Sequence, residues 1–219
     1  MADIDVRRLD FGYFVRPAAE TGTGSSRVEA CLGYLIDHRD GVLLFDTGMG
    51  SRPDVDAHYQ PRRHDLPTAL AGAGARLDQV TLVTNCHLHF DHCGGNHLFA
   101  GRPIYVQRRE LDDARSRDDY TIREWVDAPG ARYVPVDGEL EVLPGLRLVP
   151  APGHTPGSQV VVVEAGGPRV VIGGDMAVFY DELDEPRNEG QRRVRALEPE
   201  LVWLTHQHEP WRPPAAQPV

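Results

Sequence analysis

Three histidines and one aspartate occupy six consecutive positions near the middle of the chain. His87, His89, Asp91 and His92 follow an apolar run at residues 80–84 and precede a pair of glycines. If the strand continues through His87 and His89, both side chains point to one side, because side chains alternate with a period of two. The glycines would let the backbone turn the next two ligands toward a neighbouring point. This spacing supplies nitrogen and oxygen ligands for two adjacent divalent metals.

Three later positions repeat this layout of a polar side chain at the end of an apolar run. His154 lies in a loop of prolines and glycines, Asp175 follows residues 170–174, and His206 follows residues 201–205. Each position alone is more typical of a hydrogen-bonded structural residue or a turn. A histidine-rich surface loop is also an alternative for the first cluster, although buried polar groups need partners. Together the residues total five histidines and two aspartates, enough to coordinate two cations and leave a bridging position for water.

Short β-type segments and turn signals must position these side chains. Residues 30–36 and 42–45 flank an Asp-Gly turn and predict a hairpin. Residues 65–76 predict a modest helix with Asp65 as its N-cap. Further strands are expected at 80–84, 104–106, 146–149, 160–164, 170–172 and 201–204, with helices through 110–111 and at 192–197. Strands followed by mixed strands and helices favour a layered α/β domain.

Composition limits the classes of protein that this chain can belong to. Its 219 residues suit one globular domain, and 41% hydrophobic with 26% charged residues is typical of folded soluble proteins. Acidic residues outnumber basic ones by 33 to 23, and the net charge of −10 disfavours a nucleic-acid partner. Every basic residue is arginine, which excludes Schiff-base chemistry and a phosphate-loop lysine.

The termini and cysteines carry weaker signals. No apolar run approaches the roughly 20 residues of a membrane span, and the acidic opening differs from a signal peptide, so a cytoplasmic protein without a membrane partner is expected. Cys31, Cys86 and Cys93 are too irregular for a disulfide framework and are expected to be small buried side chains. We expect one folded domain over residues 1–209 and a loose C-terminal tail over residues 210–219.

The HxHxDH pattern formed by His87, His89, Asp91 and His92 resembles that of the metallo-β-lactamase-fold hydrolases. Within that superfamily the chain is most similar to the N-acyl-homoserine lactonases, and the resemblance covers roughly residues 4–208. The similar segments are residues 46–49, 87–96, 103–108, 142–145 and 152–157. The resemblance implies an α/β fold of the four-layer αββα sandwich type, with two metals at one edge.

The resemblance also implies a role for each ligand. It implies that one zinc is bound by His87, His89 and His154. A second zinc would be bound by Asp91, His92 and His206, and Asp175 would bridge the two. Asp46 would hold the metal loop without binding a metal. Iron, manganese or cobalt could replace zinc in such a site.

Three departures from the lactonase pattern bear on the substrate. The tyrosine that assists the substrate carbonyl in lactonases falls at Val178, and Tyr180 is the expected catalytic substitute. The 31 positions from Asp175 to His206 form a shorter interval than in lactonases, which changes one wall of the pocket. His208 could compete with His206 for the ligand role, but His206 directly ends the strand.

The expected reaction is hydrolysis of a small ester. Two cations lower the pKa of a bridging water from near 16 toward about 7, and the hydroxide attacks the carbonyl while Asp91 carries the proton to the leaving group. An N-acyl-homoserine lactone is the expected small-molecule substrate, which would make the protein quorum-quenching. A glyoxalase II-like thioesterase or another carboxylic ester hydrolase would use the same seven ligands. A metal- or metabolite-binding sensor is the non-enzymatic alternative. Nuclease, phosphodiesterase and β-lactamase activities fit the sequence less well.

Overall fold

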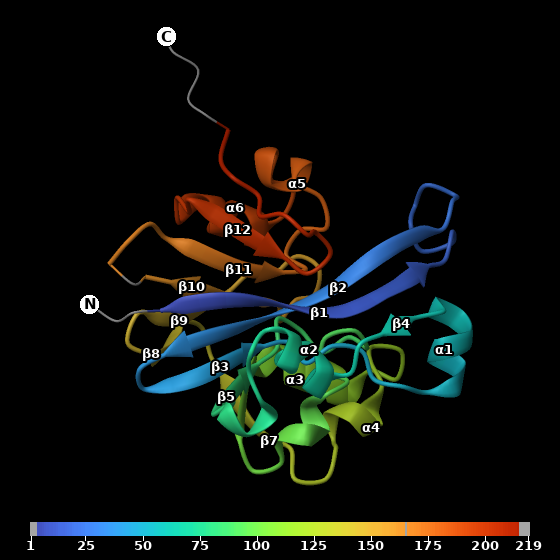
Figure 1. Cartoon of the computed structure of the whole chain (residues 1–219). Coiled ribbons are helices and arrows are strands. Elements are labelled where there is room, and N and C mark those ends of the chain that lie inside the picture. The colour runs from blue at the N-terminus through green and yellow to red at the C-terminus, as the bar shows by residue number, and fades with distance from the viewer. Residues whose placement is uncertain (1–3, 165, 215–219) are drawn as a thin grey trace.

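Two β-sheets pack face to face, with helices on both outer sides, in the computed structural model, which describes residues 4–164 and 166–214 (Figure 1). This is the expected αββα four-layer sandwich. The strands of the first sheet, in spatial order, are β4 (Arg62–Arg63), β1 (Asp5–Arg16), β2 (Arg27–His38), β3 (Gly41–Phe45), β5 (Leu82–Thr84), β6 (Pro103–Gln107) and β7 (Arg132–Val136). Those of the second sheet are β12 (Leu201–Leu204), β11 (Val170–Gly174), β10 (Gln159–Val163), β9 (Leu146–Pro150) and β8 (Leu140–Leu143).

Helices cover the outer faces of the two sheets (Figure 1). The first sheet is accompanied by α1 (Pro53–Tyr59), α2 (Leu66–Gly72), α3 (Arg108–Ser116) and α4 (Arg123–Val126), and by short 3-10 helices at Leu77–Gln79 and Asn96–Phe99. The second sheet is accompanied by α5 (Asp181–Asp184) and α6 (Glu189–Ala196). No helix within the described ranges has both the length and the apolar character needed to cross a bilayer.

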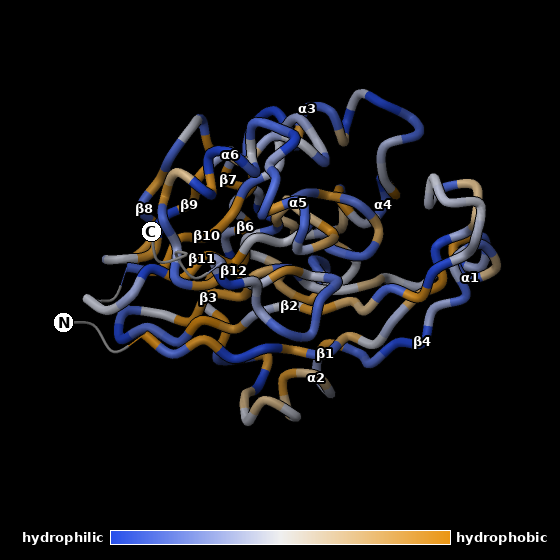
Figure 2. The backbone as a smooth tube through the Cα atoms, turned by 90° about the horizontal axis from the view of Figure 1, so that it is seen from above, coloured by the Kyte–Doolittle hydropathy of each residue, from blue (hydrophilic) through white to orange (hydrophobic). Residues whose placement is uncertain are grey.

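The valines of β10 show why these residues form a central strand. Val161 and Val163 pack into the core between the sheets, whereas Val160 and Val162 pack into the layer that contains α6. A strand that is buried on both faces needs apolar side chains at odd and even positions, and β-branched residues suit it. Apolar segments gather in the same way along the packed strands in Figure 2.

Local signals located the hairpin of β2 and β3 and one helix start correctly. β2 and β3 pair antiparallel, with Tyr34 opposite Phe45 and His38 opposite Gly41. The Asp65 side chain caps α2 by accepting the Thr68 backbone N–H at 2.7 Å. The helix ends at Gly72, earlier than the expected residue 76.

β1 is a long strand that the sequence analysis did not identify. It pairs with β2 from Asp5 to Arg16, with a register shift between Asp10 and Tyr13. Gly12 lies in the shift at φ +94°, and a Cβ there would stand 1.8 Å from the Arg62 carbonyl oxygen. Only glycine therefore allows β4 to approach β1 at this point.

Two expectations require correction. β5 ends at Thr84, so His87 and His89 lie on a loop and are not a continuation of the strand. Trp211 is 3% exposed, pairs with Val202 through both backbone groups and donates its indole N–H to Asp184 at 2.9 Å. A loose tail from residue 210 is therefore wrong for Trp211, because its large apolar ring is covered by the second sheet and its helices. Residues 215–219 of the expected tail lie outside the described residues.

Candidate metal centre

Loops at one edge of the sandwich bring the expected ligands together. Residues 85–95 follow β5, His154 lies between β9 and β10, and Asp175 and His206 follow β11 and β12. The strands are short and closely packed, so each loop starts from a fixed point. All seven expected ligands fall into two groups, and the ligand atoms in each group lie within 4.8 Å of one another.

The first group consists of His87, His89 and His154. His154 Nε2 lies 3.1 Å from His89 Nδ1, and the His87 and His89 ring centres are 4.3 Å apart. Burial and the neighbouring imidazoles lower the pKa of His89 to about 3 and hold that of His87 well below its usual value. The rings are thus neutral, which is the form that binds metals. The buried Nε2 of His87 has no hydrogen-bond partner among the described residues, as expected for an atom reserved for a cation.

The second group consists of Asp91, His92, Asp175 and His206, all buried. His206 Nε2 lies 3.0 Å from Asp175 Oδ2, and His92 Nε2 lies 3.3 Å from Asp91 Oδ2. Asp91 Oδ2, His92 Nε2 and Asp175 Oδ1 find no hydrogen-bond partner within the described ranges. Burial opposes the charge on His206, but Asp175 and Asp91 outweigh it and raise its pKa to about 9. The carboxylates therefore favour positive charge at this point.

Asp175 lies between the two groups. Its Oδ2 is 3.0 Å from His206 Nε2 and 3.8 Å from His154 Nε2. A carboxylate in this place can offer one oxygen to each of two cations. The unpartnered buried atoms and the oxygen and nitrogen donors fit divalent metal ions such as zinc.

Asp46 orients His92 through the ring nitrogen that faces away from the other ligands. The resemblance implies this role, in which Asp46 holds the metal loop without binding a metal. The Nδ1 of His92 donates to Asp46 Oδ2 at 2.8 Å, and Asp46 Oδ1 accepts the Cys86 backbone N–H at 2.8 Å. Asp46 adopts φ +62°, in the left-handed region that is costly for a side chain. The Cys86 thiol lies 3.0 Å from His87 Nδ1 and, like Cys31 and Cys93, is buried as expected.

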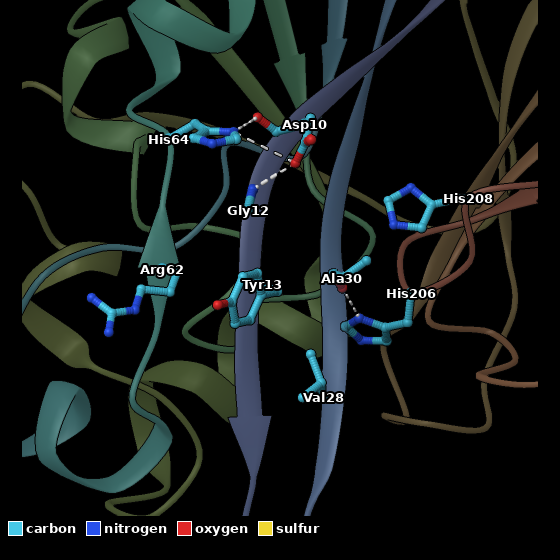
Figure 3. A pocket seen from close by; sticks show the side chains of 9 residues that line it. All are labelled: Asp10, Gly12, Tyr13, Val28, Ala30, Arg62, His64, His206 and His208. Atoms are coloured by element: carbon cyan, nitrogen blue, oxygen red, sulfur yellow. Dashed lines mark hydrogen bonds and ion pairs between the residues drawn. The ribbon is translucent and has the colours of Figure 1, made fainter.

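His206, and not His208, reaches the carboxylates. Figure 3 shows the His206 ring beside β2, where its Nδ1 donates to the Ala30 carbonyl at 2.6 Å. This contact leaves Nε2 directed at Asp175. His208 lies on the outer side and, together with His206, lines a pocket of about 390 Å³ next to β1 and β2.

A cleft of about 450 Å³ opens above the two groups, and we call it the metal cleft. Tyr59 of α1 stacks on Phe90 along one wall, with ring centres 4.2 Å apart. The lining residues combine apolar rings with charged side chains: Arg16, Glu20, Arg52, Val55, Tyr59, His89, Phe90, Asp91, Asp118, Asp119, Tyr120, Thr121, Ile122, His154 and Asp175. The cleft has room for a small molecule with both apolar and polar parts.

The fold and this loop arrangement agree with a comparison of the whole sequence. Residues 27–206 match the family described as the metallo-beta-lactamase superfamily. The chain belongs to the metallo-β-lactamase superfamily. An N-acyl homoserine lactonase of Bacillus cereus is 33% identical to it over 147 residues, which cover 60% of this chain and 57% of that relative. A probable metallo-hydrolase of Mycobacterium tuberculosis is 30% identical over 182 residues, which cover 70% and 59%.

The chain therefore spans less than two thirds of the length of these curated relatives. Solved structures share its fold. An N-acyl homoserine lactone hydrolase with N-hexanoyl-L-homoserine bound at its catalytic metal centre superposes with a TM-score of 0.78, at 24% identity and 92% coverage of both chains. AidC, a dizinc quorum-quenching lactonase, superposes with a TM-score of 0.73 at 17% identity, with 98% of this chain and 92% of AidC covered.

Tyr180 does not lie where its expected catalytic role requires. Its hydroxyl donates to the Glu209 carbonyl oxygen at 2.6 Å, and its ring packs against the core on the α6 side of the second sheet. Among the described residues that line the metal cleft, neither Tyr180 nor Val178 is found. The expected substitution by Tyr180 is not supported, because its hydroxyl is already engaged with the chain that leads to Trp211.

Glu110 of α3 connects the two loops that carry the histidines of the first group. It is fully buried and accepts hydrogen bonds from the Leu88 backbone N–H at 2.8 Å and from the Tyr120 and Thr155 hydroxyls at 2.7 Å each. Burial raises the pKa of its carboxyl, although the three donors oppose this. The sequence analysis missed this role because Glu110 is one acid among many in a charged helix.

Proposed function

We propose that the chain is a dinuclear metal-dependent hydrolase of carboxylic esters that opens N-acyl-homoserine lactones. The observation that carries the proposal is the pair of ligand groups joined at Asp175, with three unpartnered buried atoms in the second group and one in the first. A purely structural polar cluster would satisfy these atoms with hydrogen bonds. The similarity to an N-acyl homoserine lactonase supports the choice of substrate class.

Seven residues would hold two divalent cations, with zinc the expected ion. His87, His89 and His154 would bind one, Asp91, His92 and His206 would bind the other, and Asp175 would bridge them. When bound, such cations supply Lewis-acid polarisation of a carbonyl and a nucleophilic water at neutral pH.

Asp91 would move the proton. Its Oδ2 is buried, lies 3.7 Å from His206 Nε2 and has no hydrogen-bond partner among the described residues, and the neighbouring imidazole of His92 outweighs burial and lowers the pKa of the carboxyl. The ionised carboxylate can therefore accept a proton at Oδ2 and deliver it to the departing alkoxide. Phe90 and Tyr59 would exclude water from the acyl side of the ester.

A substrate panel tests the proposal. Zinc-loaded protein should open N-hexanoyl- and N-decanoyl-homoserine lactone faster than it hydrolyses S-lactoylglutathione or an aryl ester. Hydrolysis of S-lactoylglutathione alone would identify a thioesterase. A metal-replete protein that turns over none of these compounds would contradict the proposed function and favour a binding role.

A further inference from the structure

Arg16, the last residue of β1, lies on the wall of the metal cleft. It lines the cleft together with His89, Asp91 and Asp175, and its side chain is 19% exposed. An arginine at the edge of a site that binds cations is repelled by them, so its presence needs an explanation.

The guanidinium of Arg16 is held in one position. Its Nε donates to Glu29 Oε1 at 2.8 Å, and its Nη2 lies 2.8 Å from Glu29 Oε2. Glu29 is buried, with a side chain 2% exposed, and also accepts from Arg27 Nε at 2.8 Å. The Phe14 ring centre lies 5.3 Å from the guanidinium carbon. A two-point pair with a carboxylate and an aromatic neighbour fix the plane of the group.

Part of this guanidinium is left for a ligand. In residues 4–164 and 166–214, Nη1 forms no hydrogen bond, and Glu20 Oε2 lies 3.6 Å from it. A guanidinium carries five N–H donors, and Glu29 uses those of Nε and one of Nη2. Donors on Nη1 are therefore open on a side chain that lines the cleft.

Charge decides which acceptor group the N–H donors of Nη1 would bind. Arg16 and Arg27 contribute two positive charges, and Glu29 and Glu20 contribute two negative charges around them. The cluster is neutral in sum, and the whole chain carries −10. A neutral carbonyl oxygen suits such a donor better than a carboxylate, which Glu20 would repel.

Distance separates Arg16 from the reacting atoms. Glu29 Oε2 lies 2.8 Å from Arg16 Nη2 and 3.9 Å from His206 Nε2, so the Glu29 carboxylate takes the contact that links the guanidinium to the second ligand group. A substrate oxygen bound by Nη1 therefore belongs to a part of the molecule outside the ester that is cleaved.

We propose that Arg16 is a specificity-determining residue that donates to a neutral amide oxygen of the substrate, the acyl amide of an N-acyl-homoserine lactone. This inference rests on the proposed function for its substrate class. Glu29 is the positioning residue that holds Arg16 in place.

The test compares two lactones that differ in the amide. Zinc-loaded wild-type protein and Arg16→Met are assayed with N-hexanoyl-homoserine lactone and with γ-decalactone, which has no amide. Methionine keeps the apolar stem of the side chain. Arg16→Met should lower kcat/KM for the amide-bearing lactone about tenfold, as expected for loss of a charged hydrogen bond, and change that for γ-decalactone less than about twofold. An equal loss for both lactones would overturn the proposal, because a structural defect lowers both.

Two matched variants guard against misfolding. Arg27→Met removes a positive charge from the same Glu29 carboxylate, but Arg27 is not among the described residues that line the metal cleft. It should leave the ratio of the two kcat/KM values within about twofold. Arg16→Lys keeps the charge without the planar fork and should shift the ratio in the direction of Arg16→Met. A ratio unchanged in Arg16→Lys and in Arg16→Met would overturn the proposal.

A binding measurement separates this inference from the proposed function. N-hexanoylglycinamide carries the acyl amide but no ester, and its affinity for zinc-loaded protein can be measured by calorimetry. Arg16→Met should bind it about tenfold more weakly than wild-type protein, even if no lactone is opened. Wild-type protein that does not bind the probe, or equal binding by both proteins, would overturn the inference. A loss of affinity only for the anionic N-hexanoylglycine would show that Arg16 binds a carboxylate, which also overturns it.

Discussion

The Asp46 carboxylate holds the His92 ring by one nitrogen and leaves the other free. His92 Nδ1 donates to Asp46 Oδ2 at 2.8 Å, and His92 Nε2 is buried beside Asp91 and Asp175 without a hydrogen-bond partner among the described residues. Asp46 Oδ1 is occupied by the Cys86 backbone N–H. Both oxygens of Asp46 thus act as acceptors, so the proton on Nδ1 is held in place and Nε2 is the nitrogen that would face a bound cation.

Asp46→Asn should weaken metal binding without unfolding the protein. An asparagine has one acceptor oxygen, so if that oxygen keeps the Cys86 N–H, its amide group donates to His92 Nδ1 and drives the proton to Nε2. We expect zinc affinity at the second group to fall about 10- to 100-fold. Competition with a chromophoric chelator measures this, with Asp40→Asn in the exposed β2–β3 turn as a control. Unchanged affinity would show that the Asp46 contact does not set the tautomer.

Elemental analysis of zinc-loaded protein should find two metals per chain. His89→Ala removes a nitrogen from the first group, and Asp175→Asn weakens the carboxylate that lies near both groups, so each variant should lose at least one metal. His64→Ala, at an exposed position directly after β4, should keep both metals. One metal or none in the wild-type protein would contradict the dinuclear site.

Tyr180→Phe should leave turnover of the lactone within about twofold of the wild-type rate. The Tyr180 hydroxyl donates its hydrogen bond to the Glu209 carbonyl and is therefore not available to a substrate. Its loss removes one partly exposed hydrogen bond, worth about 1 kcal/mol of stability. Parallel measurements of kcat and of thermal unfolding check this. A clear fall in kcat with metals retained would show that the segment after Asp175 rearranges to bring the hydroxyl into the cleft.

Local sequence signals identified the elements that are held by local contacts. The Asp-Gly turn between β2 and β3, the Asp65 cap and the valines of β10 each specify their own geometry within a few residues. The seven ligands were also recognisable, because four of them form the HxHxDH pattern of the metallo-β-lactamase-fold hydrolases and the other three repeat its layout at the ends of apolar runs. Their convergence in two groups agrees with that expectation.

Long-range contacts account for what the sequence analysis missed. β1 carries five charged side chains among its 12 residues, which obscure its strand character, and its pairing with β2 and β4 decides its length. His87 and His89 converge through loop geometry, which no period of two describes. Trp211 pairs with Val202 of β12 and donates to Asp184 of α5, and Arg16 meets Glu29 only through strand pairing. Such pairs have no signature in spacing.

Glu110→Ala should destabilise the fold and loosen the first ligand group. It would leave the Leu88 N–H and the Tyr120 and Thr155 hydroxyls without their acceptor in a buried place, at a cost of about 2–4 kcal/mol in the free energy of unfolding. Urea unfolding measures this cost, and Asp112→Ala on the exposed side of α3 serves as the control. Glu110→Gln, which keeps one acceptor oxygen, should fall between the two. Equal stability of Glu110→Ala and Asp112→Ala would contradict the role of Glu110 as the connection between the loops.

Asp91→Asn separates proton transfer from metal binding. The amide keeps the shape of the carboxylate and can still offer an oxygen to a cation, but it cannot accept and release a proton at neutral pH. We therefore expect a folded protein in which kcat for the lactone falls about 100-fold or more, while Asp175→Asn loses metal as well as turnover. Steady-state kinetics, elemental analysis and thermal unfolding are measured on the same preparations. Near-normal turnover with full metal content would show that the proton leaves by another route. Loss of one metal would show that Asp91 acts chiefly as a ligand, because its buried Oδ2 would then serve only to hold the cation in the second group.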